Sequence, residues 1–170
     1  MPAGSDRPRY YWDTCCFIHL LDIQNRERSS RDDQMQQAVF FLEQAFREAA
    51  EGRVKLVTAE LLLAEILPVD EEHENFLKQL KACPHIELVT VSRQVFELAG
   101  HLRAEWRTNQ QKDLKAPDAI HIATALLFKP DEMWTTDSRI LKLCQPNEGT
   151  YRGLRIVRPH PLPQMRLPEM

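Results

Sequence analysis

The sequence predicts an α/β fold, a single domain in which a mainly parallel β-sheet is flanked by helices. Short apolar runs rich in aromatic and β-branched residues alternate with longer segments in which apolar residues recur every three or four positions. Such alternation is typical of strands that are joined by crossover helices. The chain has 170 residues, of which 43% are hydrophobic, and this is enough for one domain with a substantial core.

The first predicted strand is the aromatic and apolar run over residues 10–16, and a helix is expected to begin at Phe17. Residues 24–34 are polar and charged, so they are expected to form a loop or an exposed helical extension. Apolar residues at helical spacing predict a helix over residues 38–50. Gly52 follows this helix, as glycine commonly does at a helix end.

A second strand is predicted over residues 54–58, and a helix over residues 59–67 follows it. Thr58 is a suitable N-cap for that helix, and Pro68 ends it because proline cannot continue a helix. Residues 71–82 are predicted to form a further helix.

The third strand is predicted over residues 86–91. Ser92 is expected to cap a helix whose apolar face extends to Trp106, because serine is a favoured N-cap. Residues 107–113 are polar and are expected to form a loop. The most apolar helix of the chain is predicted over residues 117–128.

The remaining elements are a strand over residues 132–136, a helix over residues 138–144 and a last strand over residues 154–159. The predicted boundaries are an N-terminal extension over residues 1–9, the domain itself over residues 10–158 and a proline-rich, irregular tail over residues 159–170.

Composition limits the classes of function. The formal net charge is −3, so the chain is not a basic nucleic-acid coat. Charge is nevertheless uneven, since residues 60–74 contain six acids and no base, and residues 139–170 contain six basic and two acidic residues. This separation fits a metal site and a polyanion site at opposite poles, or an ordinary fluctuation of surface charge.

The cysteines and the apolar runs indicate the compartment. Four cysteines are present without the Cys-x-x-Cys spacing of a zinc site, so reduced thiols and a cytoplasmic protein are expected. No apolar run approaches the roughly 20 residues that cross a bilayer, so no membrane association is expected.

Four acids are expected at one edge of the sheet. Asp13 and Asp137 each close a predicted strand, Asp118 begins the apolar helix, and Glu65 lies on the helix after the second strand. Ligands of open parallel sheets bind outside the carboxyl ends of the strands. Four carboxylates that met there would repel one another, and a hard divalent cation such as Mg²⁺ or Mn²⁺ would relieve that repulsion.

Each acid also has a structural interpretation. Asp118 and Asp137 are suitable helix caps, and Asp13 is a suitable turn residue after a strand. The joint pattern favours the metal site, because Asp13 is a lone charge within an apolar stretch and such a charge needs a partner. His121 follows Asp118 by three positions. It is interpreted as a residue that packs in the core or supports the acids and hydrogen-bonds a neighbour, and proton transfer beside a metal-bound acid is the less favoured alternative.

Four segments together resemble the PIN domain family of VapC-like ribonucleases. They are YYWDTCCFI, TAELLLAEIL, APDAIHIATALL and WTTDSRIL. Their order is similar to that of the family, with a strand ending in Asp, a helix with Glu, an alanine-rich helix with Asp, and a strand ending in Thr-x-Asp. The resemblance covers residues 10–158 and implies a PIN-like, three-layer α/β/α fold.

The resemblance also implies a Mg²⁺- or Mn²⁺-dependent endoribonuclease that hydrolyses RNA phosphodiester bonds. The family's acidic positions, which are both catalytic and metal-binding, are matched by Asp13, Glu65, Asp118 and Asp137. Thr135 matches the threonine of Thr-x-Asp and is expected to contact the phosphate of the substrate or the metal-bound water. Many family members dimerise or are toxins held inactive by an antitoxin, so a homodimer and an antitoxin partner are also expected.

Some features depart from the family pattern. The chain is longer than compact members, and no further acid follows Asp137 closely, so one tightly bound metal is expected, with a second arriving with the substrate. Thr14 is expected to support the site. Arg139 is expected either to bind a phosphate of the substrate or to be an exposed helix charge.

Two other functions stay open. The first alternative is a catalytically inactive PIN-like module that binds RNA or protein. The second is a phosphatase of the haloacid-dehalogenase kind, which also has an Asp after its first strand. That chemistry needs a second Asp two residues later, where this chain has Cys15, so it is the least favoured of the three.

Overall fold

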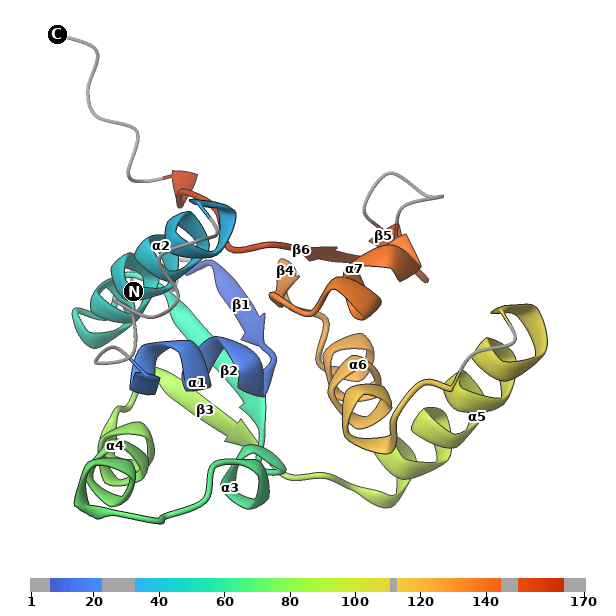
Figure 1. Ribbon diagram of the computed structural model, residues 1–170, viewed down its shortest axis with the longest axis horizontal. Helices are drawn as coiled ribbons and strands as arrows, with labels where there is room; N and C mark the ends of the chain where they lie inside the picture. The colour runs from blue at the N-terminus through green and yellow to red at the C-terminus, as the bar shows by residue number, and fades with distance from the viewer. Residues whose placement is uncertain (1–6, 23–32, 111–112, 145–149, 164–170) are drawn as a thin grey trace, which may run out of the picture.

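The computed structural model describes residues 7–22, 33–110, 113–144 and 150–163. Its six-stranded sheet has the strand order β3-β2-β1-β4-β6-β5 (Figure 1). The strands are β1 (Arg9–Trp12), β2 (Lys55–Ala59), β3 (Ile86–Val89), β4 (Glu132–Trp134), β5 (Thr150–Tyr151) and β6 (Leu154–Val157). Neighbouring strands from β3 to β6 pair in parallel, and β5 pairs antiparallel with β6. The predicted mainly parallel sheet is therefore confirmed.

Helices cover both faces of this sheet. They are α1 (Thr14–Leu21), α2 (Asp33–Ala50), α3 (Leu62–Glu65), α4 (Glu71–Ala82), α5 (Arg93–Gln110), α6 (Ala116–Phe128) and α7 (Ser138–Cys144). One hydrophobic cluster joins α1, α2 and α4 to the sheet, and a second joins α5, α6 and α7 to it. Figure 1 shows α5 and α6 together on one side and α2 and α4 on the other. The predicted three-layer α/β/α fold is confirmed.

Successive side chains along β1 pack against opposite helical layers. Tyr10 and Trp12 belong to the cluster under α1, α2 and α4, whereas Tyr11 belongs to the cluster under α5, α6 and α7. Successive side chains of a strand point to opposite faces. A strand that is covered on both faces is therefore apolar throughout, as the sequence YYW is.

The predicted boundary between the first strand and the first helix was wrong. The strand ends at Trp12 and α1 already begins at Thr14. Asp13 lies between them and has an extended backbone. Its N–H donates to the Trp134 carbonyl, and its own carbonyl accepts from the N–H of Cys16. Both segments are buried and apolar, and hydrophobicity alone cannot separate a buried strand from a buried helix.

The helix predicted over residues 59–67 was also too long. Only Leu62–Glu65 is helical, and Thr58 lies within β2 instead of capping the helix. The opposite error occurs in α5, which continues to Gln110 through part of the loop predicted over residues 107–113. The apolar face ends at Trp106, but the exposed turn that follows remains helical, and Arg107 pairs there with Asp113. The Ser92 hydroxyl accepts a hydrogen bond from the Val95 N–H at the start of α5, as predicted.

The hairpin formed by β5 and β6 was not predicted. Arg152 and Gly153 connect these strands, and both have positive φ angles of 50° and 80°. Two consecutive left-handed residues are the geometry of a tight hairpin turn, and glycine adopts it without strain.

Two predicted segments lie partly outside the described residues. Of the polar stretch 24–34, only residues 33–34 are described, and they form the first turn of α2. Of the tail 159–170, residues 159–163 are described, and Leu162 is buried at 1% exposure in the core. Within the described parts of the chain, no helix is long and apolar enough to cross a membrane.

Candidate active site at the carboxyl edge of the sheet

The strand order reverses direction between the neighbouring strands β1 and β4. The chain runs from β1 outward to β2 and β3, and then returns to place β4 on the other side of β1. Such a reversal is the topological switch point at which open α/β sheets bind ligands. Asp13 follows β1 directly, and the segment from Thr135 to Asp137 follows β4.

Asp118 reaches the same edge because of the direction of α6. The C-terminal end of α6 lies beside the start of β1, where the Arg9 side chain donates to the Lys129 carbonyl. The helix therefore begins at the carboxyl edge, and Asp118 lies in its first turn.

A threonine connects the two strand-end aspartates. The Thr135 hydroxyl donates to Asp13 Oδ2 at 2.9 Å, and its oxygen accepts from the Asp137 N–H at 3.1 Å. Thr135 is fully buried and Asp13 is only 5% exposed. Thr135 therefore lies in the site, as expected, because its hydroxyl contacts Asp13. Its contact with substrate stays a prediction.

Asp137 and Arg139 form a paired unit at the start of α7. One Asp137 oxygen accepts from the Arg139 N–H at 2.8 Å, and the Arg139 guanidinium donates to the other at 2.8 Å. Partial burial opposes ionisation of Asp137, but the hydrogen bonds from Arg139 hold its pKa below the ordinary value. Asp137 therefore caps α7, as the capping interpretation predicted. Arg139 forms an ion pair with Asp137, and its contact with a substrate phosphate stays a prediction.

Asp118 has little compensation for its charge. Among the described residues, its carboxylate has one ion pair, with Arg139 at 3.7 Å. Burial raises the pKa of Asp118 to about 6, and the negative charges of Asp13 and Asp137 add to this effect. The three aspartates therefore lie close enough to repel one another.

Glu65 belongs to a separate hydrogen-bonded group. Its Oε2 accepts from the Thr14 hydroxyl and lies 2.8 Å from His121 Nε2. This nitrogen lies 2.9 Å from Thr14 Oγ1 and 3.9 Å from Asp13 Oδ1, so His121 joins Glu65 to the aspartates. Burial opposes both charges, yet the contact with Glu65 raises the pKa of His121, and the contacts of Glu65 with His121 and Thr14 lower the pKa of the carboxyl group.

The sequence interpretation gave Tyr11 no role beyond its place in the first strand, and it left His121 as a packed or supporting residue. In the structure the Tyr11 hydroxyl lies 2.7 Å from His121 Nδ1. His121 does hydrogen-bond its neighbours, as expected. The only sequence signal was a histidine on the otherwise apolar helix that carries Asp118.

The donor atoms suit a hard cation. Asp13, Asp118 and Asp137 offer carboxylate oxygens, which Mg²⁺ and Mn²⁺ prefer, and their mutual repulsion is the conflict that a cation relieves. Within the described residues, no three His, Cys, Asp or Glu side chains already converge as a metal-binding group. A bound cation would therefore require the carboxylates to lie closer together than they do here.

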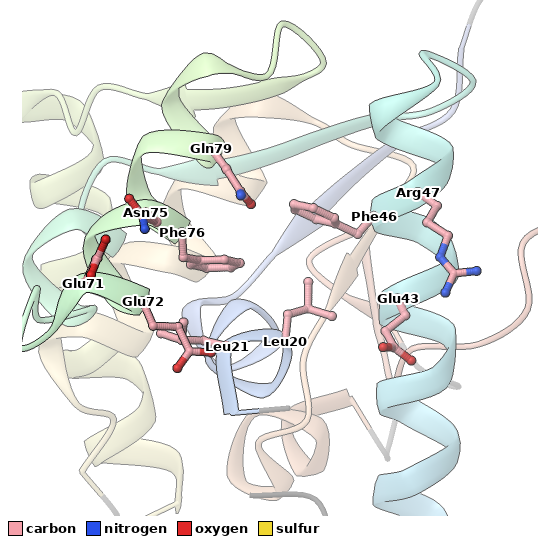
Figure 2. A pocket seen from close by; sticks show the side chains of 10 residues that line it. All are labelled: Leu20, Leu21, Glu43, Phe46, Arg47, Glu71, Glu72, Asn75, Phe76 and Gln79. Atoms are coloured by element: carbon pink, nitrogen blue, oxygen red, sulfur yellow. The ribbon is translucent and has the colours of Figure 1, made fainter. Parts of the chain in front are cut away.

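A pocket of about 680 Å³ lies away from these acids, between α1, α2 and α4 (Figure 2). Its apolar part includes Leu20 and Leu21 of α1 and the stacked rings of Phe46 and Phe76, whose centroids are 6.4 Å apart. Its charged lining consists of the acids Glu43, Glu71 and Glu72 and the base Arg47, on α2 and α4.

Comparison with known proteins bears on this architecture. A family model described as PIN domain matches residues 10–145. No curated protein sequence gives a significant match.

Solved structures with a similar fold include proteins from three bacteria. VapBC2 of Rickettsia felis, bound to a DNA fragment from its promoter, has a TM-score of 0.59 at 12% identity, with 88% of this chain and 97% of that chain covered. FitAcB of Neisseria gonorrhoeae has a TM-score of 0.56 at 13% identity, with the same coverages. A toxin–antitoxin complex of Klebsiella pneumoniae has a TM-score of 0.53 at 19% identity, with coverages of 90% and 99%.

Proposed function

Because the chain belongs to the PIN domain family, we propose that it is a Mg²⁺- or Mn²⁺-dependent endoribonuclease that hydrolyses RNA phosphodiester bonds. The observation that carries the proposal is the accumulation of negative charge at the carboxyl edge of β1 and β4. Burial and two neighbouring carboxylates raise the pKa of Asp118 to about 6. Perturbed carboxyl groups are typical of functional sites.

In this proposal the cation is held by the four acids of the sheet edge, Asp13, Glu65, Asp118 and Asp137. When bound, it supplies an activated water and stabilises charge on the phosphate. Thr135 keeps the Asp13 carboxylate oriented through its 2.9 Å hydrogen bond. Arg139 is more than half exposed at its side chain, so it is able to exchange an aspartate contact for a substrate phosphate.

The proposal is tested by cleavage of a mixed RNA substrate with Mn²⁺ and with excess EDTA. Wild-type protein should cleave with Mn²⁺ only, and Asp118→Asn and Asp13→Asn should lose at least 100-fold in rate while remaining folded. Asp113→Asn is the matched control, because Asp113 is an exposed acid paired with Arg107. Cleavage in EDTA, or full activity of Asp118→Asn, would contradict the proposal.

A second function is supported by a specific observation. Glu65, one of the four acids, is already hydrogen-bonded to His121 and Thr14. A PIN-like module that binds RNA or protein without cleavage fits this arrangement. If wild-type protein binds RNA but does not cleave it in the presence of Mn²⁺, the binding function is favoured over the nuclease.

We further propose that the nuclease is the toxin of a toxin–antitoxin pair. Structural neighbours include a toxin–antitoxin complex, and the pocket in Figure 2 offers an apolar surface with acidic side chains. An antitoxin segment with apolar and basic side chains would complement it. The test is co-purification with the product of the adjacent reading frame, which Phe76→Glu should abolish and the exposed control Lys78→Glu should not.

A further inference from the structure

His121 is a fully buried histidine with hydrogen-bond partners at both ring nitrogens. Its exposure is 0%, and it lies on α6 among the buried residues Ala119, Ile122, Ala123 and Ala125. Nδ1 is 2.7 Å from the Tyr11 hydroxyl, and Nε2 is 2.8 Å from Glu65 Oε2. An apolar side chain would fill this place without the cost of burying polar atoms.

The direction of the hydrogen bonds follows from the partners. The ionised Glu65 carboxylate only accepts, so Nε2 of His121 must carry a proton and donate it. Tyr11 fixes the other side of the ring, because its hydroxyl oxygen also accepts from the Ala59 N–H at 3.1 Å. The orientation of the imidazole is therefore set by β1 and β2 together.

Glu65 depends on such support because its own element is short. The helix α3 spans only four residues and has no side-chain cap at its N-terminus. The Glu65 side chain is 26% exposed, whereas that of His121 is fully buried. The chain of hydrogen bonds thus runs from the interior of the sheet to a carboxylate at the acidic edge.

We propose that His121, oriented by Tyr11, is a positioning residue that fixes the Glu65 carboxylate for cation binding. The proposal rests on the proposed metal-dependent function. In this arrangement Glu65 Oε2 is hydrogen-bonded to His121 and Thr14, and these two contacts hold the carboxylate in one orientation. Partners that orient metal-binding side chains typically change metal affinity by about 10- to 100-fold when they are removed.

The experiment measures Mn²⁺ binding alone, without RNA, by calorimetric titration of wild-type protein and two variants. His121→Leu removes the donor at similar volume and should weaken Mn²⁺ binding by about 10- to 100-fold. His121→Gln retains an N–H donor and should recover most of the affinity. Thermal unfolding of each variant verifies that it is folded.

A folded His121→Leu protein with wild-type Mn²⁺ affinity would overturn the proposal. If that variant does not fold, the imidazole ¹⁵N spectrum of wild-type protein decides. We expect a protonated Nε2 and a shift of the His121 signals on Mg²⁺ addition that is absent in Asp118→Asn. An unprotonated Nε2, or signals that Mg²⁺ leaves unchanged, would refute the positioning role.

The two proposals fail in different ways. Mn²⁺ binding that needs Asp118 and His121, without RNA cleavage, would reject the nuclease and retain the positioning role. Mn²⁺-dependent cleavage with unchanged Mn²⁺ affinity in His121→Leu would reject only the positioning role. Absence of Mn²⁺ binding to wild-type protein would reject both.

Discussion

Replacement of Asp118 by Asn should stabilise the metal-free protein while it abolishes the proposed activity. Burial and the charges of Asp13 and Asp137 raise the pKa of this carboxyl from its ordinary value of 3.8 to about 6. A difference of about two pH units corresponds to roughly 3 kcal/mol of destabilisation when Asp118 is ionised.

The expected gain is smaller than this upper value. The Asp118 side chain is 17% exposed, so water screens part of the repulsion. An acid in the first turn of a helix also stabilises that helix by about 0.3–1 kcal/mol, which Asn would lose. We therefore expect Asp118→Asn to raise the free energy of unfolding at pH 7.5 by about 1–2 kcal/mol, or Tm by roughly 2–8 °C.

The pH dependence follows from the direction of the pKa change. The folded protein binds a proton on Asp118 between about pH 4 and pH 6, where the unfolded chain has already released it. The contribution of Asp118 to wild-type stability therefore falls as pH rises through this range. The advantage of Asp118→Asn should be full above pH 6 and should disappear toward pH 4.

Urea unfolding in EDTA at pH 7.5 and pH 5, and again with Mg²⁺, measures these differences. Mg²⁺ at 100 times its Kd should stabilise wild-type protein by about 2.7 kcal/mol and leave Asp118→Asn unchanged. The control Asp113→Asn alters an exposed ion pair and should leave the free energy of unfolding nearly unchanged. A metal-free Asp118→Asn protein that is less stable than wild type at pH 7.5 would refute the reasoning.

Three further outcomes are expected. Arg139→Gln removes the positive charge next to Asp137. A Mn²⁺ titration should therefore show tighter binding, and the KM for RNA cleavage should rise several-fold. If both values are unchanged, Arg139 is only a surface charge. Thr135→Val removes the buried hydroxyl that contacts the Asp13 carboxylate and the Asp137 N–H. Urea unfolding should show a free energy of unfolding lower by about 1–3 kcal/mol. The control Thr135→Ser keeps the hydroxyl and should not lower it. Asp70→Ala removes the N-cap of α4, so urea unfolding should show a less stable protein while RNA cleavage stays unchanged. A loss of cleavage would place α4 in the site.

Much of the fold could be predicted because each layer leaves a pattern in the sequence. The run at β1 is apolar at every position, as required of a strand between two helical layers. Boundaries were less predictable where two buried elements adjoin. The apolar stretch around Asp13 contains the end of β1 and the start of α1, and no polar residue other than Asp13 and Thr14 separates them.

The acids at the sheet edge were predictable for a similar reason. An acid that directly follows a buried strand must lie at the carboxyl edge, and parallel strands bring these edges together. Sequence position alone therefore placed Asp13 and Asp137 near each other, and the tertiary structure agrees, since Thr135 contacts both residues.

Taken by itself, the sequence determined the α/β class with a sheet flanked by helices and the edge at which the acids gather, because these follow from local apolar patterns and chain direction. The three-layer arrangement was implied by the resemblance to the PIN domain family. Only the tertiary structure decided what each acid contacts. Glu65 meets His121 across 56 residues, and Tyr11 meets the same ring across 110 residues. The raised pKa of Asp118 likewise arises from burial and from charges on other elements, so no local pattern at Asp118 encodes it.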